Sequence, residues 1–282
     1  MDSTNLFIQR SGPENAPAIV FLHGGGVGGW MWQAQVERFN RQYRCLVPDL
    51  PGQANSKAAG PFSHARAADM VVDLIQREAF NGKAHVVGLS EGAQCTVELL
   101  SRASEVVDHA VISSALLRPM PGLRMYSRGM FAWSYRLFMA PFKNSDWWIR
   151  LNMQKAAGLP EEYYTKFKHS FQDTTEEEFV EVMYAGLHYR MPKGLEKATS
   201  RVLVVVGNKE YRQMKDSGRD LLRVLPNARG VIVSLGPKAR LPEEHNWAVT
   251  APDLFARTLH AWLESAPLPK ELIDLTAVRV RG

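Results

Sequence analysis

The sequence predicts an α/β fold: a doubly wound sandwich in which a mostly parallel sheet is flanked by helices. Three observations predict it. Short apolar runs alternate with amphipathic stretches along most of the chain, most of these runs lack the polar alternation of a half-exposed strand, and 282 residues are enough for one large α/β domain. In such a sheet, functional groups are expected at the carboxyl ends of the strands.

Six apolar runs are typical of buried strands, and they lie at residues 18–22, 44–49, 84–88, 109–113, 201–207 and 230–235. Four amphipathic stretches are typical of helices, and they lie at residues 67–77, 90–101, 216–224 and 252–263. Each of these helices follows a strand in the chain. We therefore expect the strands to run parallel, with the helices as crossover connections.

The alternation of strands and helices breaks between about residues 118 and 198. That stretch contains no strand-like run and is rich in Met, Trp, Tyr and Phe, so we expect a helical cap (118–198) inserted between two strands. The core is then expected at residues 1–117 and 199–265. Residues 266–282 begin after the last helix, carry prolines, and are expected to form a C-terminal tail.

Composition and charge are those of an ordinary globular protein, with 45% hydrophobic residues, 22% charged residues and a formal net charge of +5. The basic residues are scattered, which favours a solvated surface over a nucleic-acid partner. Cys45 and Cys95 lie in apolar stretches, as free thiols in a reducing compartment do. The first residues lack the pattern of a signal peptide, and no apolar run approaches the roughly 18 residues that span a bilayer. We expect a cytoplasmic protein without a membrane span, and a homodimer stays open.

Ser90 stands between two glycines in "HVVGLSEGAQ", residues 85–94, directly after an apolar run. It opens a helical stretch, so its context is strand, turn and helix, which a nucleophile elbow requires. The elbow is so tight that side chains at Gly88 and Gly92 would clash, and it exposes the serine oxygen at a helix N-terminus. The alternative is a serine that caps the helix, with incidental glycines. The context favours the nucleophile.

A serine hydroxyl needs a base that takes its proton, and the base needs a partner that fixes its tautomer. His245 is the candidate base because it lies after the last predicted strand and before the last helix. Glu210 is the candidate partner, three residues past Gly207 at the carboxyl end of a strand. For each of the two, a solvated loop position is the alternative. Glu243 and Glu244 are so close to His245 in the chain that their side chains are not expected to converge on its ring.

A glycine-rich loop, residues 23–26 (His-Gly-Gly-Gly), follows the first central strand. The backbone N–H of Gly25 or Gly26 and that of Glu91 are expected to form an oxyanion hole, because acyl transfer passes through an oxyanion that two such donors stabilise. The alternative is a dinucleotide site. For that site the glycine pattern fits only loosely, and Asp49 is the acidic residue that would serve it.

Together these features resemble the α/β-hydrolase family from about residue 6 to residue 263. The resemblance rests on the His-Gly loop (23–26), "VPDLPGQANS" (47–56), the serine elbow (88–92), Gly207-x-x-Glu210, and His245 before a terminal helix. It implies an α/β-hydrolase fold with an eight-stranded, mostly parallel sheet and a cap inserted after the sixth strand, and it implies no cofactor; no metal is expected either. Two positions depart from the family pattern: Gln53 stands where a histidine is usual, and Glu210 where an aspartate is usual.

A serine nucleophile in this family implies a serine esterase, in which a catalytic triad cleaves a carboxylic ester, or a related acyl bond, through an acyl-enzyme. The aromatic and methionine-rich cap suggests an apolar pocket, and hence a small, largely apolar substrate molecule. The expected substrate-binding residues are Trp30, Met130, Trp133 and Trp247.

Two alternatives stay open. The same site could hydrolyse a carbon–carbon bond or act as a hydroxynitrile lyase, and lyases of this fold generally need an added cation from the cap. Four lysines of the expected cap could supply that cation: Lys143, Lys155, Lys166 and Lys168. The other alternative is a non-catalytic protein of the same fold that binds a small ligand.

Overall fold

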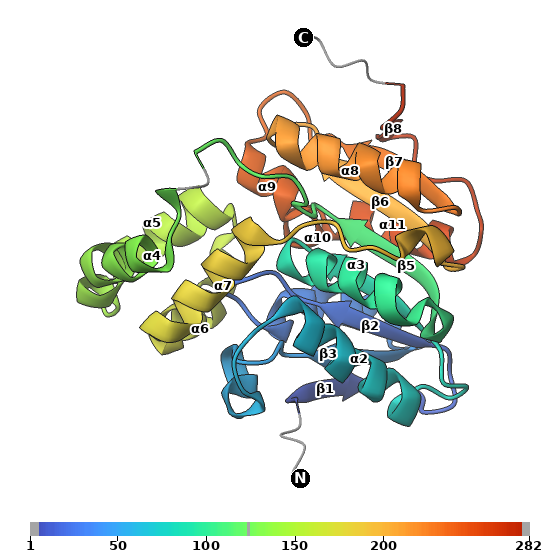
Figure 1. Cartoon of the computed structure of the whole chain (residues 1–282), viewed down its shortest axis with the longest axis horizontal. Helices are drawn as coiled ribbons and strands as arrows, with labels where there is room; N and C mark the ends of the chain where they lie inside the picture. The colour runs from blue at the N-terminus through green and yellow to red at the C-terminus, as the bar shows by residue number, and fades with distance from the viewer. Residues whose placement is uncertain (1–5, 123–124, 278–282) are drawn as a thin grey trace.

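The computed structural model describes residues 6–122 and 125–277, and these contain one eight-stranded sheet in the order β1-β3-β2-β4-β5-β6-β7-β8 (Figure 1). The strands are β1 (Ile8–Ser11), β2 (Ala18–Leu22), β3 (Arg44–Pro48), β4 (Ala84–Leu89), β5 (Val107–Ser113), β6 (Arg201–Gly207), β7 (Ala228–Val233) and β8 (Leu272–Asp274). The six inner strands run parallel, whereas β1 and β8 pair antiparallel with β3 and β7 at the two edges. The prediction of a mostly parallel sheet of eight strands is confirmed.

Helices cover both faces of the sheet (Figure 1). On one face lie α2 (His64–Glu78), α3 (Glu91–Ala103) and α8 (Arg212–Val224), and on the other lie α1 (Gln33–Phe39) and α11 (Pro252–Leu263). Successive residues of β2 serve the two faces in turn: Val20 and Leu22 pack with α2 and α3, whereas Ile19 and Phe21 pack with α11. A sheet covered on both faces needs apolar residues at every position, which is why these strands are continuous apolar runs.

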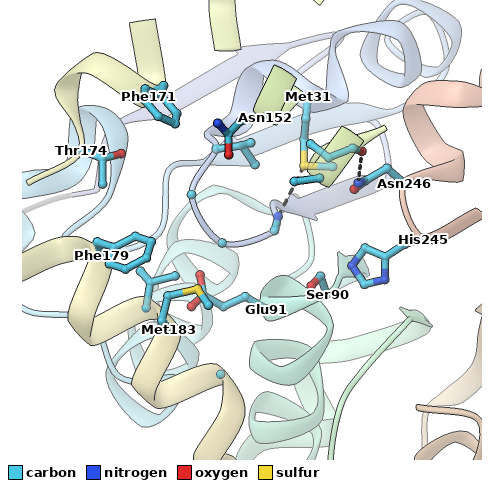
Figure 2. A pocket seen from close by; sticks show the side chains of 18 of the residues that line it. Met31, Ser90, Glu91, Asn152, Phe171, Thr174, Phe179, Met183, His245 and Asn246 are labelled. Carbon is cyan, nitrogen blue, oxygen red and sulfur yellow. Dashed lines mark hydrogen bonds between the residues drawn. The ribbon is translucent and has the colours of Figure 1, made fainter. Parts of the chain in front are cut away.

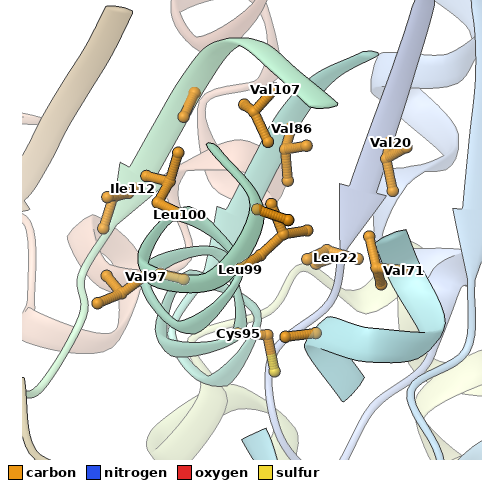
Figure 3. Close-up of a cluster of buried hydrophobic side chains, with 14 of the residues drawn as sticks. Val20, Leu22, Val71, Val86, Cys95, Val97, Leu99, Leu100, Val107 and Ile112 are labelled. Carbon is orange, nitrogen blue, oxygen red and sulfur yellow. The ribbon is translucent and has the colours of Figure 1, made fainter. Parts of the chain in front are cut away.

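The larger core lies between the central strands and the helices α2 and α3, and Figure 3 shows part of it. Val86 and Ile112 come from β4 and β5, Val71 from α2 and Leu99 from α3, and all four are fully buried. Burying a side chain of this size stabilises the fold by roughly 1.5–3 kcal/mol. This packing fixes α3 against β4, and with it the turn that joins them.

A helical segment joins β5 to β6 and lies at one end of the sheet (Figure 1). Its helices are α4 (Arg128–Ser134), α5 (Asp146–Leu151), α6 (Tyr164–Asp173) and α7 (Glu176–His188), with the shorter turns η5 (Tyr135–Met139), η6 (Ala140–Phe142), η7 (Asn152–Ala157), η8 (Glu161–Tyr163) and η9 (Leu195–Lys197). In the described residues five strands precede this segment, not the six that the resemblance implied. Three strands follow it, because β8 adds an antiparallel edge after β7.

Short elements account for most of the other differences from the sequence prediction. β8 lies in residues 266–282, which were expected to be a tail, and it pairs Leu272 with Val233 while Leu275 packs fully buried beside it. A three-residue edge strand is too short to show a periodicity, as is β1. Other helices of residues 6–122 and 125–277, none of which was predicted, are α1, η1 (Gly29–Trp32), η2 (Ala54–Ala59), η3 (Ser104–Val106), α9 (Leu241–His245) and α10 (Trp247–Thr250). Within the described ranges, every helix is too short or too polar to cross a membrane.

Candidate active site

Ser90 lies on the turn between β4 and α3, in a backbone conformation that residues with a side chain rarely adopt, with φ at +57° and ψ at −112°. Its N–H donates to Ser113 O over 2.8 Å, which holds the turn against the end of β5. Strain of this kind persists only where surrounding contacts impose it, and it clusters at functional sites. A strained serine between a strand and a helix is the geometry expected of a nucleophile elbow.

Two glycines allow this turn. A Cβ atom at Gly92 would lie 2.2 Å from Leu22 O, and one at Gly88 would lie 2.2 Å from Gly92 O. Both distances are far shorter than a van der Waals contact, and both involve backbone atoms that cannot move aside. The helix α3 therefore approaches β2 and β4 closely only because positions 88 and 92 carry no side chain.

Glu210 and His245 form a close pair at the carboxyl edge of the sheet. Nδ1 of His245 lies 2.7 Å from Oε1 of Glu210, and Oε2 of Glu210 accepts the N–H of Gly207 over 2.9 Å. Both carboxylate oxygens act as acceptors, so Nδ1 of His245 carries a proton, and the tautomer that this selects for the neutral ring has its lone pair on Nε2. Glu210 comes from the loop after β6 and His245 from the end of α9, so the fold brings together residues that the sequence separates.

The two glutamates beside His245 in the chain have other partners. Glu243 pairs with Arg240 at the surface over 2.5 Å. Glu244 is fully buried, and its carboxylate accepts the N–H groups of Lys209 and Leu235 over 2.5 Å and 3.1 Å. Glu244 therefore holds the loops after β6 and β7 together, which is a structural task.

A cavity of about 690 Å³ brings the candidate residues together. Ser90 and His245 both line it, and Figure 2 shows the His245 ring beside Ser90 at its base. Gly25, Gly26 and Glu91, the expected oxyanion-hole residues, line the same cavity. Five of the residues singled out for catalysis thus line the same cavity, and Glu210 reaches it through its bond to His245.

The glycine-rich loop is held in place by the buried side chain of His23. Its Nδ1 lies 2.8 Å from Gly24 O, and its Nε2 accepts the N–H of Leu50 over 2.8 Å, which fixes the proton on Nδ1. Burial lowers the pKa of His23, so the ring stays neutral. A Cβ atom at Gly24 would lie 3.6 Å from Cβ of Ser90, which places the loop directly against the serine.

Asp49, the residue on which the dinucleotide alternative depends, is occupied by the loops themselves. Its Oδ1 accepts the N–H of Gly29 over 2.7 Å, and its Oδ2 accepts two bonds from Asn55, over 2.8 Å and 3.1 Å. The side chain is 1% exposed. Both oxygens are committed to the protein, so Asp49 is not placed to bind a ribose.

Helical residues between β5 and β6 supply most of the apolar wall of the cavity. They include Phe138, Trp148, Phe167, Phe171, Phe179, Val182 and Met183. Of the four expected substrate-binding residues, Trp30 lines the cavity and the other three do not, as far as the described residues go. Trp133 is 59% exposed on the outer side of α4, half-buried Met130 lies on the same helix, and Trp247 is buried in the core, where its indole N–H donates to Ser113 Oγ.

The structure therefore places Met130, Trp133 and Trp247, which were expected to bind the substrate, outside the lining of this cavity. The sequence shows that a helix is rich in aromatic residues, but not how the helix is rotated about its axis. Rotation decides which side chains face the cavity, and it depends on packing between helices that are far apart in the chain. In α4, Trp133 lies on the exposed side of the helix, whereas Phe131 is buried and Ser134 lines the cavity.

The side chain of Glu91 was not singled out by the sequence, which pointed only to its N–H. Glu91 is 4% exposed, and its Oε2 accepts a hydrogen bond from Gln53 Nε2 over 2.7 Å. Burial raises the pKa of Glu91 to about 8; the bond from Gln53 opposes this rise and the charge of Glu178 adds to it. Gln53, the departure from the family pattern, thus binds the residue next to the candidate nucleophile.

Ser114 also lines the cavity and was missed. It follows β5 with φ at +62°, is 1% exposed, and its Oγ has no hydrogen-bond partner among the described residues. The signal that could have found it is the pair of serines that ends a buried strand at the carboxyl edge of the sheet.

Among the described residues, one group of side chains has the composition of a metal site, and it lies far from this cavity in the fold. His85, Asp108 and His109 sit at the amino ends of β4 and β5, with Asp108 Oδ2 at 3.6 Å and 3.4 Å from the two Nδ1 atoms. However, Arg201 donates to His109 Nε2 over 3.2 Å, which leaves the proton on Nδ1. A protonated Nδ1 is no metal ligand, and the cation of Arg201 opposes a second cation there.

Comparison with protein families gives one match over most of the chain. A model described as "Alpha/beta hydrolase family" matches residues 19–277. The carboxylesterase YbfK of Bacillus subtilis (strain 168) is 33% identical over 109 residues, which are 38% of this chain and 36% of that protein. The 3-oxoadipate enol-lactonase 1 of Acinetobacter baylyi is 39% identical over 88 residues, which are 31% of this chain and 32% of that protein. The aligned segments thus span about a third of these curated relatives.

Solved structures share the architecture over nearly the whole chain. A thermophilic esterase from Thermogutta terrifontis superposes with a TM-score of 0.71 at 18% identity, covering 92% of this chain and 93% of that one. At this identity the likeness concerns the fold alone.

Proposed function

The chain belongs to the alpha/beta hydrolase family, and from this premise we propose that it is a serine esterase. It cleaves a carboxylic ester of a small, largely apolar substrate through an acyl-enzyme. The observation that carries the proposal is the shared cavity: Ser90 and His245 line it, and Nδ1 of His245 is bound to Glu210 over 2.7 Å. The names of the two curated relatives, a carboxylesterase and an enol-lactonase, favour the same reaction class.

In the proposed reaction, His245 Nε2 takes the proton of Ser90 Oγ as that oxygen attacks the ester carbonyl carbon. Glu210 keeps the proton of His245 on Nδ1 and stabilises the imidazolium that forms. The imidazolium then gives its proton to the alkoxy oxygen as the carbon–oxygen bond breaks and the alcohol leaves. A water molecule, deprotonated by His245 in the same way, hydrolyses the acyl-enzyme and restores the serine.

The tetrahedral intermediate carries a negative oxygen, and backbone N–H groups would stabilise it. We assign this role to Glu91, at the N-terminus of α3, and to Gly25 or Gly26 of the loop after β2. Each preorganised donor is worth roughly 3–4 kcal/mol in the transition state. The dipole of α3, a helix of 13 residues, adds to the same field.

The substrate class follows from the cavity wall. Apart from the candidate catalytic groups, that wall is mainly aromatic and aliphatic, and the helical segment at residues 118–198 contributes much of it; we propose that this segment is a cap. A cavity of about 690 Å³ is of the size that holds a small organic molecule. We also propose a cytoplasmic location, which Cys45 and Cys95 favour as buried free thiols.

The lyase alternative is weakened by the positions of the cap lysines. Among the described residues, none of the four candidate lysines lines the cavity. Lys143 donates to the carbonyl oxygens of Gln172 and Thr174, and Lys168 pairs with Asp146 over 2.7 Å. A cation that must meet a substrate anion would have to leave these partners.

The proposal is tested by covalent labelling and by hydrolysis. A fluorophosphonate, which modifies activated serines, should add its mass to the peptide that contains Ser90 and to no other peptide. Methyl and p-nitrophenyl esters of increasing acyl length should be hydrolysed. A protein that binds such esters tightly without labelling or turnover would instead be the ligand-binding alternative.

A further inference from the structure

The carboxyl group of Glu91 has no part in the proposed reaction, which uses only the backbone N–H of that residue. Glu91 lines the cavity next to Ser90, and Figure 2 shows its side chain extending from the start of α3 toward Met183. The carboxyl group receives one hydrogen bond, from Gln53 to Oε2. Its other oxygen, Oε1, is buried and has no partner in the described part of the chain. A buried oxygen without a partner at the edge of a ligand cavity calls for an explanation.

The surroundings favour the uncharged acid. An ionised carboxylate needs several donors when it leaves water, and here one amide N–H reaches it. On the side of Gly25 the neighbour is apolar: a methyl group built on Gly25 would lie 2.7 Å from Val182 and 3.4 Å from Glu91 Oε2. The charge of Glu178 acts against ionisation from α7.

The position of the proton follows from the bond that Gln53 makes. An amide N–H donates, so Oε2 acts as the acceptor, which in a carboxylic acid is preferentially the carbonyl oxygen. The proton then lies on Oε1, the oxygen without a partner. The bond from Gln53 holds Oε2 in place, and a small rotation about the last torsion, which is broad for a glutamate, turns Oε1 toward a bound molecule while that bond is kept.

We propose that Glu91 selects the substrate: as the uncharged acid, it donates a hydrogen bond from Oε1 to an uncharged oxygen atom that the ester carries in addition to its scissile group. The preferred substrates are then oxo, alkoxy or hydroxy esters. A purely hydrocarbon ester offers no acceptor, so the O–H of Glu91 stays without a hydrogen bond. An ester that carries an ammonium group gains no ion pair, because the acid is uncharged. This inference rests on the proposed esterase function and names the substrate class of the same site.

The proposal predicts an effect of pH on substrate preference, so the charged and titratable groups around Glu91 must be considered. On α7, the charge of Glu178 acts on Glu91, and burial raises the pKa of Glu178 as well, while Lys57 at 3.7 Å opposes that rise. On α3, burial raises the pKa of Cys95 well above its ordinary value, so this thiol stays neutral. His245 lines the same cavity from α9. The pKa of Glu91 is raised to about 8, so in mildly alkaline solution its carboxyl group loses the proton and can no longer donate a hydrogen bond.

The experiment compares methyl hexanoate with its 3-oxo, 4-oxo and 5-oxo analogues and with methyl 6-aminohexanoate. Values of kcat/KM are measured for the wild type, Glu91→Gln, Glu91→Leu and Glu177→Gln. Glu91→Gln keeps the shape of the side chain. The N–H of Gln53 then bonds to the amide oxygen of the new side chain, so that an amide N–H takes the place of the O–H at Oε1. The Leu variant removes the donor. Glu177 is an exposed glutamate on α7, so its variant is a matched control for loss of a charge.

We expect at least one oxo ester to exceed methyl hexanoate by about three- to tenfold in the wild type, the range that one net hydrogen bond gives. Glu91→Gln and Glu177→Gln should keep this ratio, and Glu91→Leu should bring it near one. Between about pH 6.5 and about pH 9 the ratio should fall in the wild type but not in Glu91→Gln, whose amide does not ionise.

Two results would overturn the inference. One is an equal ratio in the wild type and Glu91→Leu. The other is a preference of the wild type for the ammonium ester already at about pH 6.5, which would mean that Glu91 is ionised below its raised pKa of about 8 and binds a cation. Failure of the esterase proposal is distinguishable, because then methyl hexanoate itself is not hydrolysed. In that case the same ratios are measured as dissociation constants for the Ser90→Ala protein by calorimetry, where the Glu91 variants must show the same pattern.

Discussion

Glu210 holds His245 from one side only: its Oε1 lies 2.7 Å from His245 Nδ1, while its Oε2 is anchored by the N–H of Gly207. The carboxylate side chain is 1% exposed, so it is screened from water on the side away from the ring. A glutamate is one methylene longer than the usual aspartate, and the bond to Gly207 shows how the extra length is taken up. The side chain folds back onto the strand end from which it came.

This pair predicts the effects of changing Glu210. In Glu210→Gln an amide N–H can face Nδ1, which favours the wrong tautomer of His245, and loss of a triad acid costs about 10⁴ in kcat in other enzymes. Glu210→Asp keeps the charge and shortens the reach, so its loss should be smaller. Steady-state kinetics on one ester would give the order wild type, Asp, Gln.

The control for that series is Glu243→Gln, which removes a surface glutamate close to His245 and should leave kcat near the wild-type value. Glu244→Gln is unsuitable as a control, because Glu244 is buried and accepts two backbone N–H groups. If Glu210→Gln is as active as the wild type, another residue orients His245.

Ser90→Ala should abolish hydrolysis and leave the protein folded. The change removes one oxygen atom and opens no cavity, and alanine meets the same backbone strain at φ of +57° as serine does. Removal of a triad serine typically lowers kcat by about 10⁶. The far-ultraviolet circular dichroism and the melting temperature should match those of the wild type. Retention of more than about a tenth of the rate would mean that Ser90 is not the nucleophile.

Because the pKa of Glu91 is raised on folding, we expect the stability of the protein to depend on pH. Its pKa is about 8 in the folded protein and 4.5 when unperturbed, so between these values the folded state binds a proton that the unfolded chain has lost. The contribution of Glu91 to the free energy of unfolding is therefore full below about pH 4.5 and is lost as pH rises toward 8, by roughly 1 kcal/mol for each pH unit.

Urea unfolding at several pH values checks this prediction. Buried His64 and His85, whose pKa values burial lowers to about 4, act in the opposite direction below pH 6.5, so only the difference between two proteins isolates Glu91. Glu91→Gln should gain stability relative to the wild type as pH rises, whereas Glu177→Gln should follow the wild type. A constant difference between Glu91→Gln and the wild type would show that Glu91 is ionised throughout.

Gly92→Ala should destabilise the protein severely, because the added Cβ would lie 2.2 Å from the carbonyl oxygen of Leu22 and neither backbone can move without separating α3 from β2. We expect a loss of at least about 3 kcal/mol in the free energy of unfolding. Gly129→Ala is the matched control: it lies in the exposed helix α4 with its nearest neighbour at 3.9 Å, and it should stabilise the protein by up to about 1 kcal/mol. Equal melting temperatures for the two variants would contradict the elbow packing.

Chelation should leave ester hydrolysis unchanged. The proposed nucleophile, base and oxyanion donors are all supplied by the chain. The cluster of His85, Asp108 and His109 lies at the amino ends of β4 and β5, away from the carboxyl ends where the cavity lies. Activity is measured after exhaustive dialysis against EDTA and again after each divalent cation is added back. A loss of rate that one metal restores would place that metal in the reaction.

The sequence by itself determined the inner part of the fold. Six continuous apolar runs became the six parallel strands, with bounds that differ by no more than two residues at either end, because a strand buried on both faces must be apolar at every position. The elbow could also be predicted, since Gly88 and Gly92 are required locally wherever a helix follows a strand so tightly. The edge strands β1 and β8 could not, because three or four residues carry no measurable periodicity.

Only the tertiary structure decided what the cavity is made of. Whether Trp133 or Phe138 faces it depends on how each helix is rotated when it packs, and that is set by contacts between distant segments. The state of Glu91 depends in the same way on where it is buried. A carboxyl group in water is ionised at neutral pH. Here the folded chain excludes water, which raises the pKa of Glu91, and the single hydrogen bond from Gln53 only partly opposes that rise.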